Sequence, residues 1–178
     1  LDWLRAAKSA YDASYQVKAQ PGDLDMGEVL AHLRDVVPEN AIVTNGAGNF
    51  AIWPNKFLKF GQEGRLLAPQ SGAMGYGLPA AIAAKLHDPS RFVLCFAGDG
   101  DFQMNGNELG SAMQAGLSLI ILIVNNGTYG TIRMHQERHY PERVSGTELV
   151  NPDFVTLAKA YGFYGERVEK TEDFAAAF

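Results

Sequence analysis

The stretch FVLCFAGDGD, residues 92–101, is an apolar run that ends in a glycine-flanked aspartate, Asp99. A strand that is apolar at every position, rather than at alternate positions, is typical of a parallel sheet covered on both faces. Residues 41–44 and 119–124 are similar apolar runs, and helical patterns lie between the runs. This alternation predicts an α/β fold with a doubly wound parallel sheet and helices on both faces.

Outward from these strands, the sequence predicts helices with recognisable ends. One helix is expected to run unbroken from Phe102 to Ala115 and to be closed by Gly116. Another is expected to begin at Pro152, because proline suits the first helical position. Further helices are expected at 1–15, after an Asp25 cap as far as Val37, in the second half of 72–86, at 129–139 and after a Thr171 cap, with a last short strand at 164–168.

Length and composition exclude several classes of protein. A chain of 178 residues can bury about 70% of its surface, which is enough for one core. A net charge of −5 without a basic run disfavours binding to nucleic acid. The longest apolar stretch, 117–124, is too short to span a bilayer. Cys95 is the only cysteine, so an internal disulfide and a cysteine metal cage are excluded. With no signal-peptide pattern, a cytoplasmic location is expected.

The residues that carry chemistry lie where two of the strands end. Asp99 and Asn126 are separated by one helix and one strand, and a right-handed crossover of this kind returns to the same edge of the sheet. One carboxylate oxygen, one amide oxygen and nearby carbonyls suit a hard divalent cation such as Mg²⁺, held jointly with phosphate oxygens. The glycines beside Asp99 let a bulky anion approach the backbone N–H groups of the next helix.

Simpler interpretations compete with this metal site. Asp99 alone fits a phosphoacceptor or a turn at a strand end. Residues 46–51 match a dinucleotide fingerprint, but Pro54 is expected to break the required helix and no acidic residue ends a second strand. His135 and His139 have the spacing of zinc ligands, but their HQERH segment lacks the zinc-protease glutamate, so a solvated or substrate-facing helix face is expected.

The motifs together resemble a known family. The GDG at 98–100, the NN pair at 125–126 and the upstream SGAMGYGLPAA at 71–81 are similar to motifs of thiamine-diphosphate enzymes. The similarity is to the pyrophosphate-binding domain of the acetolactate synthase and 2-oxo acid decarboxylase group, and it covers the chain from about residue 23 onward. The resemblance implies the thiamine-diphosphate-binding fold, with thiamine diphosphate and Mg²⁺ as cofactors.

The resemblance also implies roles for individual residues. Asp99 and Asn126 would hold Mg²⁺ through their side chains, and Thr128 through its carbonyl. Gly72 would accept a hydrogen bond from the cofactor's amino group, and Met74 would support its bent conformation; these two are the residues implied to activate the cofactor. The implied cofactor-binding set is Asn45, Gly46, Ala47, Gly48, Asn49, Gly72, Met74, Gly98, Asp99, Gly100, Asp101, Asn126, Thr128, Tyr129 and Gly130, with N–H groups of Gly100 and Asp101 facing the diphosphate.

The implied activity is decarboxylation or carboligation of a 2-oxo acid, with the cofactor as the electron sink. Acetolactate synthases usually have Gln-His where this chain has Gly48-Asn49, and Met and Trp where it has Thr131 and His135. Acetolactate synthesis and FAD binding are therefore not assigned, and the 2-oxo acid stays open. A non-catalytic homologue that binds the cofactor or holds an assembly together is the alternative, and a dinucleotide-binding module is a more distant one.

The resemblance implies partners as well. In the family, a glutamate on the pyrimidine-binding domain of a neighbouring subunit drives cofactor activation, and nothing in this chain matches that domain. The chain begins and ends within helical patterns, so we expect a fragment of a longer homodimeric or homotetrameric protein, with on the order of 350 further residues upstream. Residues 1–22 are expected to be a preceding helix and linker, and 23–178 the cofactor-binding domain, truncated at its C-terminus.

Overall fold

The computed structural model describes residues 1–178 and divides the chain into two compact units. The sheet unit comprises Pro38–Ile52 and Phe60–Glu166. The helical unit comprises Leu1–Val37, Trp53–Lys59 and Arg167–Phe178. The predicted division at residue 22 stays a prediction. No helix in either unit combines the length and the apolar character needed to cross a membrane.

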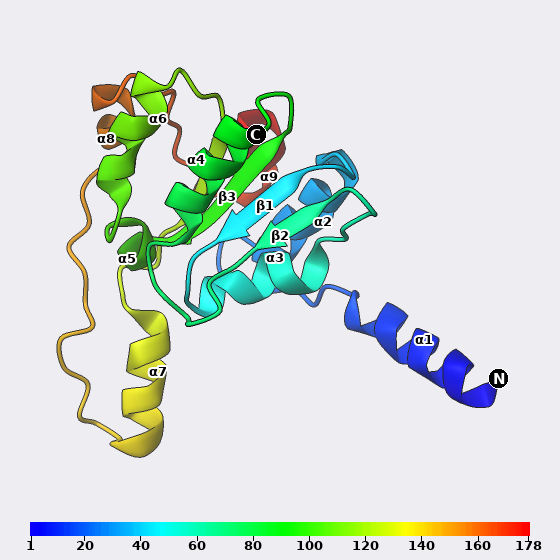
Figure 1. The fold of residues 1–178 in the computed structure, drawn as a ribbon. Helices are drawn as coiled ribbons and strands as arrows, with labels where there is room; N and C mark the ends of the chain where they lie inside the picture. The colour runs from blue at the N-terminus through cyan, green and yellow to red at the C-terminus, as the bar shows by residue number, and fades with distance from the viewer. The chain divides into compact units, whose positions relative to one another are not determined.

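The sheet unit is built on four parallel strands, which Figure 1 shows from β2 through β1 to β3. Their order is β2-β1-β3-β4, so the chain moves outward to β2 and then crosses to the other side of β1. The register pairs Thr44 with Cys95 and Gly98 with Val124. The predicted α/β class with a parallel sheet is confirmed. The strands are β1 (Ile42–Asn45), β2 (Arg65–Leu67), β3 (Val93–Gly98) and β4 (Ile120–Val124).

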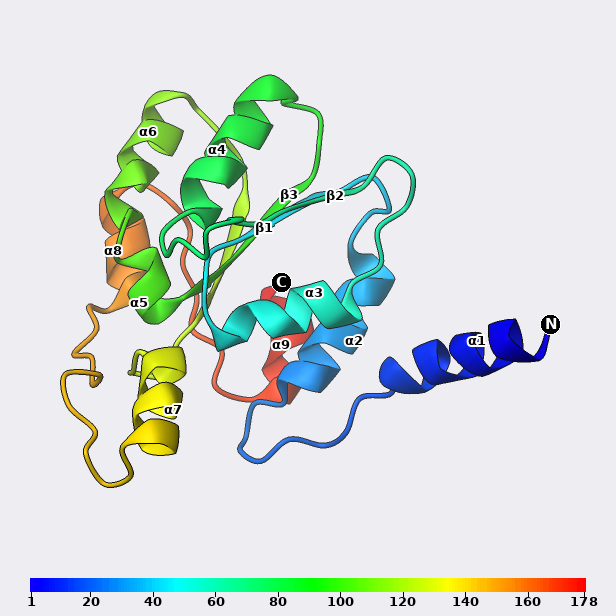
Figure 2. The ribbon, with the colours of Figure 1, turned by 60° about the horizontal axis from the view of Figure 1, so that its bottom comes forward.

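The core of the sheet unit lies between the sheet and two helices, α4 and α6, which lie on one side of it (Figure 2). Small side chains fill the space between these layers, namely Ala81 and Ala112 on the helices and Cys95 on β3, and all three are fully buried. Their small size lets the helices approach the sheet closely. The unit's helices are α4 (Gly77–His87), α5 (Asp99–Phe102), α6 (Leu109–Gln114), α7 (Gly130–His139) and α8 (Phe154–Ala160), with 3₁₀ turns η1 (Asn49–Ala51) and η2 (Gly106–Glu108).

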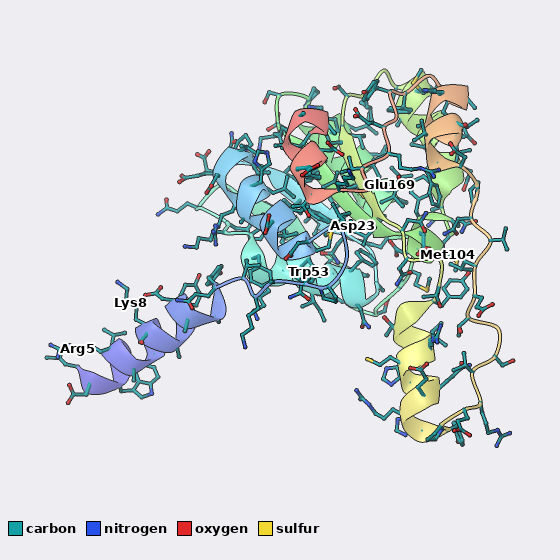
Figure 3. The ribbon with its side chains drawn as sticks, turned by 180° about the vertical axis from the view of Figure 1, so that it is seen from behind. Arg5, Lys8, Asp23, Trp53, Met104 and Glu169 are labelled. Atoms are coloured by element: carbon teal, nitrogen blue, oxygen red, sulfur yellow. The ribbon has the colours of Figure 1, made fainter.

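The helical unit contains α1 (Asp2–Ser14), α2 (Met26–Val36), most of α3 (Ile52–Phe57) and α9 (Thr171–Ala177). The predicted Asp25 cap is confirmed, since its carboxylate accepts hydrogen bonds from the N–H groups of Gly27 and Glu28. His32 on α2 packs edge-on against Phe174 on α9, with ring centroids 5.9 Å apart. Helix α1 has no buried residue, and Figure 3 labels its Arg5 and Lys8.

The predicted helix from Phe102 to Ala115 is wrong as one continuous element. The structure has α5, a break, η2 and then α6 in its place. At the break, the side-chain amide of Asn105 donates a 2.9 Å hydrogen bond to the carbonyl of Gly75. This bond joins the segment to a loop 30 residues upstream, and the chain turns there instead of continuing as a helix.

Four smaller predictions also need correction. Pro54 does not prevent a helix, because it is the third residue of α3, where its missing N–H breaks no intrahelical bond. Residues 164–168 form no strand. Helix α8 is capped by Asp153, so Pro152 precedes the cap rather than opening the helix. Thr171 is the first residue of α9, and its hydroxyl instead accepts from the Asp25 N–H at 2.7 Å.

Candidate cofactor site

The candidate site lies at the carboxyl ends of β1 and β3. The strand order reverses between these two neighbouring strands. After β1 the chain adds β2 on one side of β1 and then returns to add β3 on the other side. Ligands of open α/β sheets bind at such a point, because the loops after the two strands diverge and leave a crevice. The loop after β1 carries residues 45–49 and the turn after β3 carries residues 98–101, so both predicted glycine loops lie there.

Asp99 is buried at the start of α5 and its two carboxylate oxygens have different surroundings. Its Oδ2 accepts from the backbone N–H of Gly127 at 2.8 Å and from the side-chain amide of Asn151 at 2.7 Å. No hydrogen-bond donor contacts its Oδ1. The Gly127 bond joins Asp99 directly to the Asn125-Asn126 loop after β4, as the predicted crossover requires.

The loop from Asn126 to Gly130 presents oxygens in a tight turn. The Oδ1 atom of Asn126 accepts from the Thr128 N–H at 3.1 Å, and the Thr128 carbonyl accepts from the Gly130 N–H at 2.9 Å. An amide or peptide oxygen has two lone pairs, so each of these oxygens keeps one for another partner. The Tyr129 N–H is used in a 2.8 Å bond to the Thr147 carbonyl.

Asp101 joins three segments of the site through its buried carboxylate. Its Oδ1 accepts from the N–H groups of Ala47, at 3.0 Å, and Gly75, at 2.8 Å. Burial raises the pKa of this carboxyl above its usual range, while the hydrogen bonds from Gly75 and Ala47 act in the opposite direction. The expectation for Asp101 concerned only its backbone N–H, and this role of its carboxylate was missed.

Glycines are required at two of these turns by close contacts. A Cβ on Gly46 would lie 1.9 Å from the Asp101 carboxylate, and one on Gly100 would lie 2.4 Å from the Tyr129 ring. The Asp101 carboxylate therefore requires a glycine at position 46, and the Tyr129 ring requires a glycine at position 100.

The predicted activating residues lie on the loop before α4. Gly75 has a φ of +83°, and a Cβ there would lie 2.7 Å from the Cβ of Met104, which Figure 3 labels. Gly72 is exposed with a φ of +67°, and a Cβ there would meet no atom within 4 Å. Met74 is half-buried on the same loop. The loop thus faces open space at Gly72, as a residue that receives a ligand must.

The other predicted residues lie on the same edge of the sheet unit. Asn45 ends β1, and its side-chain amide donates to the Gly46 carbonyl at 2.7 Å. The Asn49 N–H donates to the hydroxyl of Thr131 on α7 at 2.9 Å, and Gly48 before it has a φ of +155°. The N–H of Ala47, a member of the predicted cofactor-binding set, donates to Asp101.

Asn151 is a site residue that sequence reasoning missed. Its side-chain amide contacts Asp99, Asn125 and Gln103 at 2.7–2.8 Å. It lies 52 residues after Asp99, in the segment before α8, and no local pattern points to it. Its position next to the Asp153 cap indicates only that a helix follows.

The donor set fits a hard divalent cation held together with an anionic ligand. No three His, Cys, Asp or Glu side chains cluster anywhere in the structure, so the protein offers one carboxylate rather than a complete metal cage. Asp99 Oδ1, Asn126 Oδ1 and the Thr128 carbonyl are all oxygens with free lone pairs. A cation bound by so few protein oxygens keeps coordination positions for water and phosphate oxygens, which is typical of Mg²⁺.

A parallel α/β domain with a candidate site for a cation and an anion at its switch point is the class that this geometry defines. The family model for thiamine pyrophosphate enzymes, C-terminal TPP binding domain, matches residues 46–178. The chain belongs to this family. The predicted resemblance is thereby confirmed, and so is thiamine diphosphate as the ligand of the matched domain.

Individual relatives agree with this assignment. The chain is 40% identical over 156 residues to an acetolactate synthase large subunit of Parasynechococcus marenigrum (strain WH8102), covering 84% of this chain and 25% of that protein. It is 33% identical over 179 residues to the acetolactate synthase isozyme 2 large subunit of Escherichia coli (strain K12), covering 99% and 33%. The chain therefore spans about a quarter to a third of the length of these relatives.

A solved structure shows the same fold. The Rhodococcus jostii RHA1 thiamine diphosphate-dependent 4-hydroxybenzoylformate decarboxylase superposes with a TM-score of 0.82 at 33% identity. The match covers 91% of this chain and 31% of that one. The relatives include both synthases and a decarboxylase, and each has the implied cofactor domain as one part of a longer chain.

Proposed function

We propose that this chain is the cofactor-binding domain of a thiamine-diphosphate- and Mg²⁺-dependent enzyme that decarboxylates or carboligates 2-oxo acids. The observation that carries the proposal is the convergence of Asp99, the Asn126–Gly130 loop and the Asp101-linked loops at the switch point. Relatives named as acetolactate synthases and a 2-oxo acid decarboxylase support the same class of reaction.

The residues of this chain would have separate tasks. Asp99, Asn126 and the Thr128 carbonyl would hold Mg²⁺, and the N–H groups of Gly100 and Asp101 would bind the diphosphate. Met74 and the Gly72 carbonyl would orient the pyrimidine end. When bound, the cofactor supplies the electron sink for loss of CO₂ from a 2-oxo acid. Asp101 would hold the loops of Ala47 and Gly75 in place around the bound molecule.

The rest of the active site would come from a second protein surface. We propose that a pyrimidine-binding domain of a neighbouring subunit contributes a catalytic glutamate, in a cytoplasmic homodimer or homotetramer. No described residue of this chain is placed to supply that glutamate, and the open space in front of Gly72 leaves room for a partner. The identity of the 2-oxo acid would be determined by residues on both sides.

The test is the binding of thiamine diphosphate to the full-length parent enzyme by calorimetry, with and without Mg²⁺. The Asp99→Ala variant should lose Mg²⁺-dependent binding, because neutral oxygens alone do not offset the dehydration of the ion. Asn126→Ala removes a neutral ligand and should weaken binding less. Unchanged affinity in Asp99→Ala would refute the metal site.

A further inference from the structure

A segment from Thr147 to Asn151, here called the brace, lies antiparallel to the proposed metal loop. The N–H of Leu149 donates to the Gly127 carbonyl at 2.9 Å, and the Thr147 carbonyl accepts from the Tyr129 N–H and the Thr128 hydroxyl at 2.8 and 2.7 Å. An isolated bridge pairs Thr128 with Glu148. The conformation of the metal loop thus depends on residues about 20 positions further along the chain.

At the end of the brace, every polar atom of the Asn151 side chain has a partner. Its Nδ2 donates to Asp99 Oδ2 at 2.7 Å and to Asn125 Oδ1 at 2.8 Å. Its Oδ1 accepts from the Gln103 side-chain amide at 2.8 Å. Because two acceptors lie at Nδ2, these two bonds by themselves fix the orientation of the amide.

As a consequence, the two carboxylate oxygens of Asp99 differ in their hydrogen bonds. Two N–H groups, from Asn151 and Gly127, occupy Oδ2, and Oδ1 has no donor. A carboxylate held in this way can offer a cation only one oxygen without breaking hydrogen bonds. Mg²⁺ requires near-octahedral coordination by single oxygens, whereas Ca²⁺ readily accepts both oxygens of one carboxylate.

We propose that Asn151 is a positioning residue that keeps Asp99 a one-oxygen ligand and thereby favours Mg²⁺ over Ca²⁺ at this site. The proposal rests on the proposed function, because it assumes that Asp99 binds the cation. It goes beyond that function by assigning metal selectivity to a residue that does not touch the metal. Partners that orient metal ligands in this way tune both affinity and selectivity.

The test measures the binding of Mg²⁺ and of Ca²⁺ to the full-length protein by calorimetry, at saturating thiamine diphosphate. In Asn151→Ala we expect the Mg²⁺ affinity to fall about tenfold, and the Ca²⁺ affinity to fall by less than about threefold. Asn151→Leu keeps the approximate size of the side chain and removes both donors without adding a charge, so it should shift the preference in the same direction. Gln103→Ala is the matched control, because it removes only the outward bond and should leave the preference unchanged.

The outcomes separate this inference from the proposed function. A general loss of structure in Asn151→Ala would lower the Mg²⁺ affinity and the Ca²⁺ affinity by the same factor. The inference is overturned if both Asn151 variants leave the ratio of the two affinities unchanged. If the unaltered full-length protein binds thiamine diphosphate with neither cation, the proposed function itself is wrong. A shifted preference in both variants, with an unchanged one in Gln103→Ala, supports the role of Asn151.

Discussion

At the scale of single residues, the site depends on glycines that face bulky neighbours. Gly100 lies between the two aspartates of the turn after β3, and the Tyr129 ring and Leu149 side chain cover it. The ring reaches Gly100 from the start of α7, so this contact fixes the turn that carries Asp99 against the metal loop. The glycine serves close packing here, because its φ does not lie in the left-handed region.

Gly100→Ala should therefore destabilise the protein. The new Cβ would lie 2.4 Å from the Tyr129 ring and 3.0 Å from Leu149 Cδ1, and overpacking of this kind costs about 1–3 kcal/mol. Urea unfolding measures the change in the free energy of unfolding. Gly110→Ala is the matched control, since its Cβ would meet only Tyr161 at 3.5 Å within a helix and should be neutral or stabilising by up to about 1 kcal/mol. Equal effects of the two variants would contradict the steric argument.

At the scale of elements, the predictable parts of the fold are those specified by local sequence. The runs that became β3 and β4 are apolar and the run that became β1 begins with apolar residues, and the Asp25 cap has its own signal in the chain. Strand β2 was missed because it has three residues, of which only Leu66 and Leu67 are apolar. The break before η2 depends on Asn105 and a distant carbonyl, and Asn151 likewise contacts Asp99 only in the folded chain. Such tertiary contacts leave no periodic pattern to detect.

The Asp25 cap gives a pH-dependent prediction for α2. Its carboxylate accepts from the Gln20 N–H at 2.8 Å and from the Gly27 N–H at 2.7 Å, and these bonds, the Gln20 bond foremost, lower its pKa below the ordinary 3.8. A lowered pKa adds stability that is fully present above the ordinary value and is lost as the pH falls through the folded value. Asp25→Ala should cost about 1–2 kcal/mol at neutral pH.

The measurement is the free energy of unfolding between pH 7 and pH 3. The difference between the unaltered protein and Asp25→Ala should narrow as the pH falls below about 4, where the carboxylate begins to be protonated in the unfolded chain. Asp35→Asn removes an exposed carboxylate from the same helix and serves as the control. A difference that stays constant over this range would show that the charge of Asp25 adds nothing.

At the scale of the whole molecule, the chain has one complete core and one incomplete site. Leu94, Cys95 and Phe96 on β3 are completely buried within the whole chain, so we expect the chain to fold without a partner. The proposed site, in contrast, would contact only the diphosphate end of the cofactor, and Gly72 faces open space. The proposed second wall would come from the part of the relatives that this chain does not match.

The 178-residue chain by itself should fold, but it should bind thiamine diphosphate weakly or not at all and release no CO₂ from 2-oxo acids. Weak binding follows because ordering a flexible cofactor against one wall is not offset by contacts on the other side. Circular dichroism checks folding, and calorimetry and CO₂ release check the rest. Decarboxylation well above that of free cofactor, lost in Asp99→Ala, would show that the chain holds a whole active site.

The position of Cys95 in the central strand has a practical consequence. It is the only cysteine, it is fully buried, and burial raises the pKa of its thiol to about 12. A thiol in this state does not react with an alkylating reagent while the sheet is closed, because the reactive thiolate and access to it are both lacking. Each alkylated molecule has therefore opened its sheet at least once, and the rate of labelling reports that opening at a cysteine that the protein already contains.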